Sequence, residues 1–200
     1  MTTVSTSPLR ILEYPHPTLR HKSKPLCKVD AELRRMVREM FDLMYEAKGI
    51  GLAANQVDLP YRMFIVNTDP EHDRAAEQVF INPVVTGHSG SEDFEEGCLS
   101  LPELNGMVKR PGKVEIEAYD LAGERIEGQL DELPARVFQH ELDHLDGVLF
   151  IDRLSPSGRL ALKEALDEFE VAFHGSRRRG EIPSDEAIAE RLAELERLRT

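Results

Sequence analysis

The stretch QHELDH, residues 139–144, restricts the fold of this 200-residue chain more than any other part of the sequence. It contains the H-E-x-x-H pattern, and on a helix the side chains of His140 and His144 lie one turn apart on the same face. Two imidazoles placed in this way can bind one metal ion, and Glu141 then lies beside the ion as a candidate general base. A polar helix surface explains the five-residue pattern about equally well. A third metal ligand is therefore needed to favour a metal site over a polar surface.

The residues around this stretch predict that it is helical. Pro134 suits the first turn of a helix, and Gly147 suits its C-terminal end. Residues 148–151 are then expected to form a short strand. Either Ser155 or Ser157 can cap a further helix. That helix carries apolar residues at helical spacing, namely Leu160, Leu162, Leu166, Phe169 and Phe173.

A catalytic metal site needs a third protein ligand, because its fourth position stays open to water. The metzincin pattern is excluded, because Phe150 stands where its third histidine would be. A thermolysin-like site would take Glu164 from the next predicted helix. The other candidate is Cys98 in EGCLS, a thiolate that follows a glycine, although a free cysteine is more often a small buried hydrophobic residue. Spacing in the sequence leaves Glu164 and Cys98 both open.

The sequence before this helix predicts a mixture of helix and antiparallel sheet. Asp30 can cap a helix whose apolar residues recur three and four positions apart. Apolar runs predict strands at 63–66 and 79–81, and the alternating stretch 114–129 predicts a hairpin that turns at 121–123. Helices and a sheet of several short strands are therefore expected.

Composition and charge exclude several classes of protein. The chain is 40% hydrophobic and 31% charged, and 25 Lys and Arg residues against 37 Asp and Glu residues give a net charge of -12. This charge opposes binding to DNA. No apolar run is long enough to cross a bilayer, and residues 1–10 show no signal or transit pattern, so we expect a cytoplasmic protein that binds no membrane. In that compartment no disulfide is expected between Cys27 and Cys98.

Three separate stretches together make the sequence resemble the peptide deformylase family: GIGLAANQ at 49–56, EGCLS at 96–100 and QHELDH at 139–144. With the similar N-terminal ILEYPHPTLR, the resemblance covers about residues 9–173. It implies a single α+β domain in which antiparallel sheets surround a central metal-binding helix, with further N- and C-terminal helices. The implied activity is removal of the formyl group from the N-terminal formylmethionine of nascent polypeptides, with release of formate.

The resemblance also implies roles for individual residues. The implied metal ligands are Cys98, His140 and His144. Glu141 would act as general base and then acid, and the formyl oxygen would accept hydrogen bonds from the Gln56 amide and the Leu99 backbone N–H. The residues expected to bind the substrate's methionine are Gly49, Ile50, Gly51 and Val137. Asn105 lies near the position where some members of the family carry an arginine. The resemblance therefore does not say how the peptide backbone beyond the methionine is bound. The implied metal is Fe(II), with Zn, Ni or Co as substitutes.

Two other functions compete with this one. The first is a zinc endopeptidase that uses Glu164 as its third ligand, but that reading gives GIGLAANQ and EGCLS no role. The second is a ribosome-associated binding module without activity, based on the basic segments 20–24 and 177–179. The presence of Glu141 and Cys98 opposes it, because an inactive protein needs neither.

Residues 1–176 form the expected catalytic domain, and residues 177–200 form a C-terminal tail outside the resemblance. After a break at 174–180 the tail is expected to be helical. Its six Arg and six acidic residues leave no excess positive charge for RNA, although a transient ribosome contact stays an alternative. Its apolar stripe predicts packing on the body of the protein or on a second copy in a homodimer. The stripe consists of Ile188, Leu192 and Leu195.

Overall fold

The computed structural model describes residues 9–69, 71 and 73–200, and residues 1–8, on which part of the expectation about export signals rests, lie outside these ranges. The strands are β1 (Gly51–Ala53), β2 (Met63–Val66), β3 (Gln78–Ser89), β4 (Glu92–Cys98), β5 (Leu101–Arg110), β6 (Lys113–Tyr119) and β7 (Arg125–Asp131). The α-helices are α1 (Ala31–Glu46), α2 (Glu132–Leu145), α3 (Pro156–Ala161), α4 (Lys163–Arg178) and α5 (Asp185–Arg199). None of the helices in the described ranges has the length and apolar character of a membrane span.

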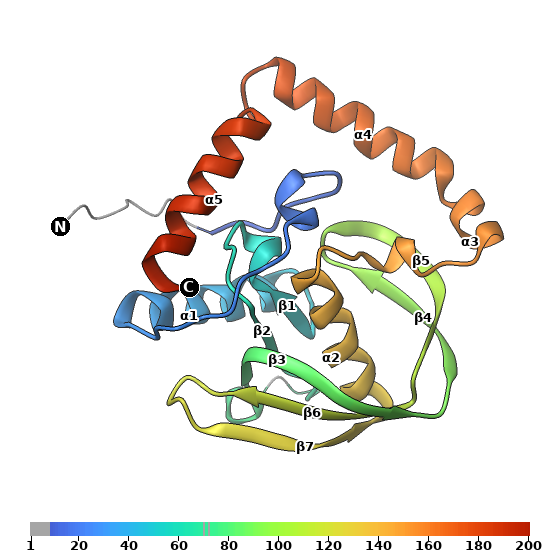
Figure 1. Cartoon of the computed structure of the whole chain (residues 1–200). Coiled ribbons are helices and arrows are strands. Elements are labelled where there is room, and N and C mark those ends of the chain that lie inside the picture. Colours follow the sequence, from blue (N-terminus) through green and yellow to red (C-terminus); the bar gives the residue numbers. More distant parts are fainter. Residues whose placement is uncertain (1–8, 70, 72) are drawn as a thin grey trace.

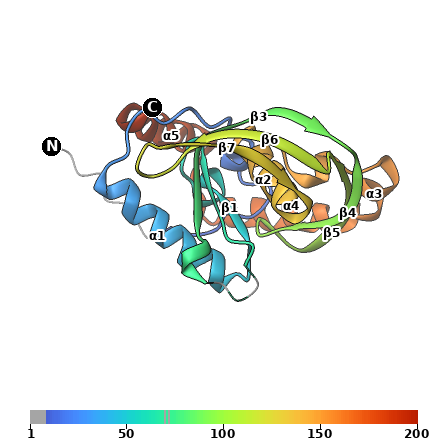
Figure 2. The same cartoon turned by 90° about the horizontal axis from the view of Figure 1, so that it is seen from below.

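The strands form two antiparallel sheets (Figure 1). One has five strands in the order β1-β2-β3-β6-β7, and the other consists of β4 and β5 alone. The predicted hairpin at 114–129 is confirmed as β6 and β7. The fold is the expected α+β arrangement, and α2 lies between the five-stranded sheet and the β4–β5 pair in both ribbon views (Figure 2).

Alternation along β2 explains why helices cover both faces of the large sheet. Met63 and Ile65 pack in an apolar cluster with α1, whereas Phe64 and Val66 point the other way, into a cluster with α2. Phe138 of α2 meets the Phe64 ring edge-on at a centroid separation of 5.1 Å. Because all four β2 residues are buried, a shift of this strand by one residue would exchange the two cores. The packing therefore fixes where α2 stands.

The predicted ends of the first two long helices are confirmed. Asp30 caps α1 by accepting a 2.9 Å hydrogen bond from the backbone N–H of Leu33. Pro134 lies in the first turn of α2. Gly147 follows that helix with a φ of 73°, and a Cβ atom there would lie 2.5 Å from the Arg20 carbonyl oxygen. Only glycine therefore fits this turn.

Three local predictions were wrong. Residues 148–151 do not form a strand, because Asp152 accepts a hydrogen bond from the Leu149 N–H and closes a 3₁₀ turn over Phe150–Asp152. The helix capped by Ser155 ends after one short segment, α3, and the chain continues as α4. The expected break at 174–180 begins later, since α4 runs to Arg178 before Gly180 turns the chain.

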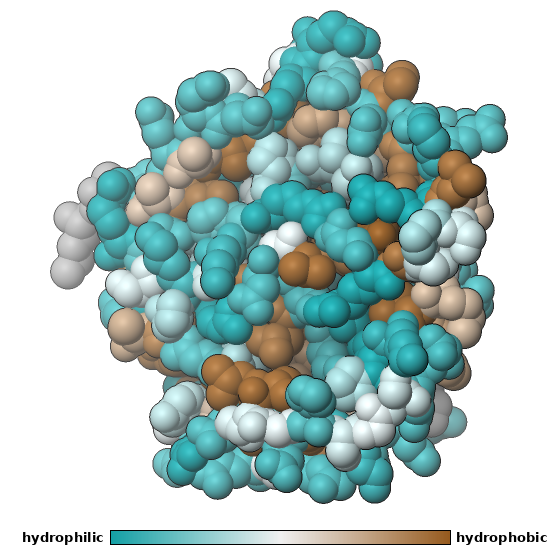
Figure 3. Space-filling view, turned by 45° about the vertical axis from the view of Figure 1, so that its right-hand side comes forward, coloured by the Kyte–Doolittle hydropathy of each residue, from teal (hydrophilic) through white to brown (hydrophobic). Residues whose placement is uncertain are grey.

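The C-terminal helix α5 packs against the chain's own N-terminal half (Figure 1). Its stripe of Ile188, Leu192 and Leu195 is buried, with 3–4% of each residue exposed, and Leu195 joins the core cluster that contains α1. The predicted packing of the stripe on the body of the protein is confirmed. The face shown in Figure 3 is mostly hydrophilic, with apolar side chains in small separate groups.

Candidate active site

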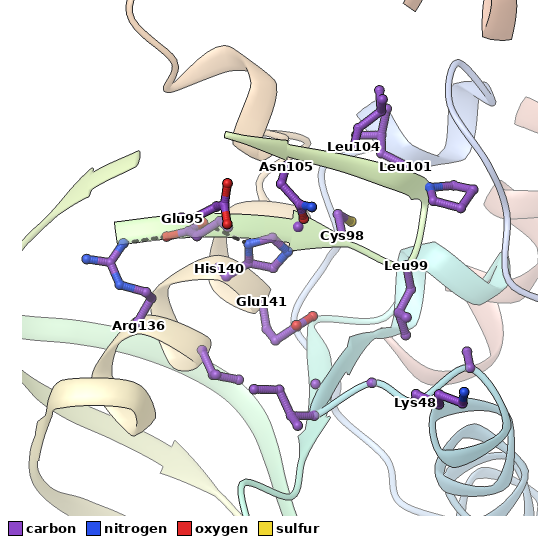
Figure 4. A pocket seen from close by; sticks show the side chains of 18 of the residues that line it. Lys48, Glu95, Cys98, Leu99, Leu101, Leu104, Asn105, Arg136, His140 and Glu141 are labelled. Carbon is purple, nitrogen blue, oxygen red and sulfur yellow. Dashed lines mark hydrogen bonds and ion pairs between the residues drawn. The ribbon is translucent and has the colours of Figure 1, made fainter. Parts of the chain in front are cut away.

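A pocket of about 610 Å³ opens between α2, the β4–β5 pair and the chain that follows α1 (Figure 4). Of the ten site residues predicted from the sequence, nine line it: Gly49, Ile50, Gly51, Gln56, Cys98, Leu99, Val137, His140 and Glu141. The tenth, His144, is buried, and its Nε2 lies 3.2 Å from the Cys98 sulfur. The fold thus brings all ten residues to one place.

Cys98 and the two histidines form a compact group of metal-ligating atoms. One such atom from each of Cys98, His140 and His144 lies within 4.8 Å of the other two. Cys98 ends β4, and the histidines lie one turn apart on α2. Glu164, by contrast, is exposed on α4 and is not part of the group. The structure therefore places Cys98, and not Glu164, beside the two histidines.

A carboxylate behind His140 fixes the orientation of its ring. His140 Nδ1 lies 3.0 Å from Glu96 Oε2, and Arg110 donates hydrogen bonds of 2.7 and 2.9 Å to the same carboxylate. Burial alone would raise the pKa of Glu96, but the hydrogen bonds from His140 and Arg110 outweigh burial and lower it well below its usual value. A charged carboxylate on Nδ1 leaves Nε2 of His140 available as a ligand.

Glu141 is a buried carboxylate with one unused oxygen. Among the described residues its Oε2 has no hydrogen-bond partner, and burial raises the pKa of Glu141 to about 7, partly opposed by the nearby His140. Gly51 faces its other oxygen, and a Cβ atom on Gly51 would lie 2.5 Å from Oε1. A larger residue at position 51 would therefore displace the Glu141 carboxylate.

The side-chain amide of Gln56 is held in one orientation. Its Oε1 accepts a 2.8 Å hydrogen bond from the Ala53 N–H, and its Nε2 donates to Ser100 Oγ at 3.1 Å and lies 3.5 Å from the Cys98 sulfur. These contacts turn the NH₂ group toward Cys98. The glycine-rich stretch that precedes Gln56 is ordered as β1 and a 3₁₀ turn.

The entrance of the pocket has apolar and polar walls. Phe94 and Leu133 line it although 58% and 43% of these residues are exposed. Asn105 lines it from β5, where it pairs with Gly97 of β4. Leu99 closes over Gly49, since a Cβ atom on Gly49 would lie 2.6 Å from Leu99 Cδ1.

A group of buried charged residues at the pocket, two of which line it, was not predicted from the sequence. They are Glu96, Arg110, Arg136 and Asp143, each less than 10% exposed. Arg110 joins Glu96 to Asp143, which it contacts at 2.7 Å, and Arg153 also pairs with Asp143. Two of these residues, Glu96 and Asp143, lie inside the motifs EGCLS and QHELDH, and this position could have marked them as functional. The sequence does not identify their partners, which lie 14 to 44 positions away in the chain.

A buried carboxylate beside a Cys–His–His group, on a helix that faces a pocket, is the arrangement of a metal-dependent hydrolase. The sequence model of the polypeptide deformylase family matches residues 8–160. The chain therefore belongs to the polypeptide deformylase family, whose members are enzymes that remove the N-formyl group from nascent peptides.

Individual relatives agree with this assignment. The peptide deformylase of Rhodopirellula baltica is 46% identical over 193 residues, which are 96% of each chain. Peptide deformylase 1B of Arabidopsis thaliana, named as chloroplastic and mitochondrial, is 41% identical over 186 residues, 92% of this chain and 67% of that one. A solved peptide deformylase from Plasmodium falciparum superposes with a TM-score of 0.81 at 39% identity and covers 84% of this chain and 98% of that one.

Proposed function

We propose that this enzyme uses one divalent metal ion, held by Cys98, His140 and His144, to hydrolyse the formyl group from N-terminal formylmethionine and release formate. The observation that carries the proposal is the approach of one sulfur and two imidazole ligand atoms to within 4.8 Å of one another, beside a buried carboxylate. Membership of the deformylase family supports the reaction, and the geometry of the pocket residues supports their roles in it.

The donor atoms fit a divalent transition metal. A thiolate and two imidazoles suit Fe, Zn, Ni or Co, and three protein ligands leave a position for water or substrate. The orientation of His140 by Glu96 is the usual support for such a ligand. When bound, the metal lowers the pKa of water from about 15.7 toward about 7 and polarises a carbonyl oxygen. Fe(II) as the working metal stays a prediction.

In this proposal Glu141 moves the proton. Its unpaired Oε2 accepts a proton from the attacking water as the water oxygen bonds to the formyl carbon. When the C–N bond breaks, the same carboxyl gives that proton to the departing amine nitrogen. The products are formate and a free N-terminal methionine.

Two donors would stabilise the negative charge that develops on the formyl oxygen. The Gln56 amide is already oriented by Ala53 and Ser100, so it loses little freedom when it donates. The backbone N–H of Leu99, directly after Cys98, is the second donor in this proposal. Each such donor is typically worth on the order of 10²–10³ in rate.

The substrate's methionine side chain is assigned to the apolar wall beside Glu141. Ile50 and Val137 line the pocket there, and Gly49 and Gly51 let the backbone run close to it. The catalytic part is assigned to residues 1–176 and the tail to 177–200. The cytoplasm, a transient ribosome contact and a homodimer through the tail all stay predictions.

The proposal is tested by incubating the purified enzyme with formyl-Met-Ala-Ser and measuring formate and free amine together. We expect equal amounts of both, with the internal peptide bonds intact. Acetyl-Met-Ala-Ser is the matched control, since it adds one methyl group at the reacting carbon, and it should react far more slowly. Cleavage inside the peptide, without formate, would contradict the proposal and favour the endopeptidase.

A further inference from the structure

The element that carries Cys98 and the element that carries the two histidines belong to different parts of the fold. Cys98 ends β4 in the two-stranded sheet, and the histidines lie on α2. Within the part of the chain that the structure describes, no backbone-to-backbone hydrogen bond joins α2 to β4 or β5. Side chains must therefore fix the separation of the thiolate from the imidazoles.

Arg136 makes the most extensive of these side-chain links. It lies on α2 one turn before His140, and it donates to Glu96 Oε1 at 2.7 Å, to the Val108 carbonyl at 3.1 Å and to the Glu92 carbonyl at 3.0 Å. Two of the three acceptors are backbone groups, one on β4 and one on β5. Figure 4 shows Arg136 and His140 side by side on α2, each joined by a dashed line toward the β4 side chains.

The same guanidinium group also supports the pocket wall. It lies 5.5 Å from the centroid of the Phe94 ring, a cation–π distance, and Phe94 is otherwise more than half exposed. The fork of Arg136 thus reaches three points along β4 and β5 at once. A lysine could not reproduce this, because it has one point of charge and no planar fork.

We propose that Arg136 is a positioning residue that holds β4 and β5 against α2, and so sets the distance of Cys98 from His140 and His144. This inference rests on the proposed metal site. Arg110 has a different task, since its contacts go to the carboxylates of Glu96 and Asp143 and to no backbone group. Among the described residues, Arg136 is thus the α2 side chain that donates to the backbone of both strands.

The test is the rate at which the cobalt-loaded enzyme releases its metal to an excess of chelator, together with its visible absorption spectrum. Arg136→Met keeps the length of the side chain but removes its donors, and we expect release at least about tenfold faster and a shifted cobalt spectrum. Arg153→Met is the matched control, because the Arg153 side chain is 42% exposed and pairs with Asp143 of α2 rather than with β4 or β5. Its release rate should stay within about twofold of the wild type.

Two further variants keep the test decisive. Arg136→Lys retains the charge but loses the contacts to both carbonyls, so it should also release cobalt faster than the wild type even if Arg136→Met does not fold. Phe94→Ala should raise KM and leave the rate of cobalt release unchanged. This variant distinguishes an effect on the pocket wall from an effect on the metal ligands. Wild-type release and spectrum in Arg136→Lys, or in a folded Arg136→Met, would overturn the inference. Normal cobalt binding by Cys98→Ala would instead overturn the proposed metal site.

Discussion

Glu96 in the pocket wall and Glu196 in α5 both accept hydrogen bonds from basic side chains, but their surroundings differ. The partners of Glu96 are buried, with 3% of the Arg110 side chain and 10% of the Arg136 side chain exposed. Glu196 pairs with Lys24, whose side chain is 59% exposed, and with His21. Water therefore screens the charged contacts of Glu96 little, whereas it screens the contact of Glu196 with Lys24 more strongly.

The tail and the pocket region also differ in the groups that line their interiors. The tail is held by three buried aliphatic side chains and by the buried Arg199, which donates hydrogen bonds to Tyr61 and Asp30. The pocket region combines its apolar wall with thiol, imidazole and carboxylate groups. The comparison assigns the chemistry to the pocket and stability to the tail. The family match ends at residue 160, before both α4 and α5. Changes in the two regions should consequently affect different measurements.

The largest effect is expected from the third metal ligand. Cys98→Ala removes the only sulfur from the ligand group, so bound metal should be lost or greatly weakened and deformylation should fall at least about 10³-fold. Glu164→Ala in α4 is the control, and its metal content and deformylation rate should stay at wild-type levels. Metal content measured by mass spectrometry checks both. Loss of metal in Glu164→Ala alone would contradict the assignment of the site.

The next largest effect is expected at the carboxylate that moves the proton. Glu141→Ala should keep its metal but lose at least about 10²-fold in kcat, because no other group in the described site is placed to take the proton. Glu141→Gln tests the same point with the shape retained. A metal-loaded variant with nearly normal turnover of formyl-Met-Ala-Ser would remove Glu141 from the mechanism.

Removal of the tail should affect stability and spare the chemistry. A chain that ends at Ser176 loses three buried aliphatic side chains, each worth about 1.5–3 kcal/mol, so Tm should fall by more than about 10 °C. Its rate on formyl-Met-Ala-Ser should stay within about threefold at a temperature where it is folded. An unchanged Tm together with loss of ribosome co-sedimentation would instead show that the tail serves docking.

A matched pair within α5 sharpens this prediction. Leu195 is 3% exposed and Leu198 is 43% exposed, only three positions apart. Leu195→Ala should lower the free energy of unfolding by about 2–5 kcal/mol, and Leu198→Ala by well under 1 kcal/mol. Urea unfolding of the two variants measures the difference. Equal effects would mean that α5 does not pack on the body in solution.

A further prediction concerns the pH dependence of stability at the two glutamates. Because the pKa of Glu96 is lowered in the folded state, its contribution to stability is present above the unfolded value of about 4.3 and is lost as pH falls below that value. The stability difference between wild type and Glu96→Gln should therefore shrink below about pH 4. In the presence of chelator at pH 7, we expect Glu96→Gln to lower the free energy of unfolding by about 3–5 kcal/mol. Glu196→Gln should lower it by under about 1 kcal/mol. Similar values for both variants would contradict the comparison.

Only part of the fold and of the site could be predicted from the sequence. The HExxH pattern, the cap at Asp30 and the alternation at 114–129 depend on neighbours in the chain, and the structure agrees with them. The strands β4 and β5 were not predicted, because the charged run at 92–96 and Pro102 hide any alternation. The short strand expected at 148–151 failed because a single side chain, Asp152, closes a turn there.

The buried charges lay beyond sequence reasoning for another reason. Arg136 and Glu96 are 40 positions apart, and their contact depends on how α2 stands against the β4–β5 pair. Local spacing carries no information on that placement. By contrast, Cys98 could be proposed as a ligand because the three family motifs occur together, although spacing alone left Glu164 equally open.

The central claim is that a metal ion on Cys98, His140 and His144 is required for deformylation, and a titration with chelator tests it most directly. Bound metal and formate release from formyl-Met-Ala-Ser are measured in the same samples as metal is withdrawn and then restored with Fe(II) or Ni(II). The account predicts about one ion per chain, a rate that falls in proportion to bound metal, and recovery on reloading. Formate release at the full rate from metal-free protein would contradict it.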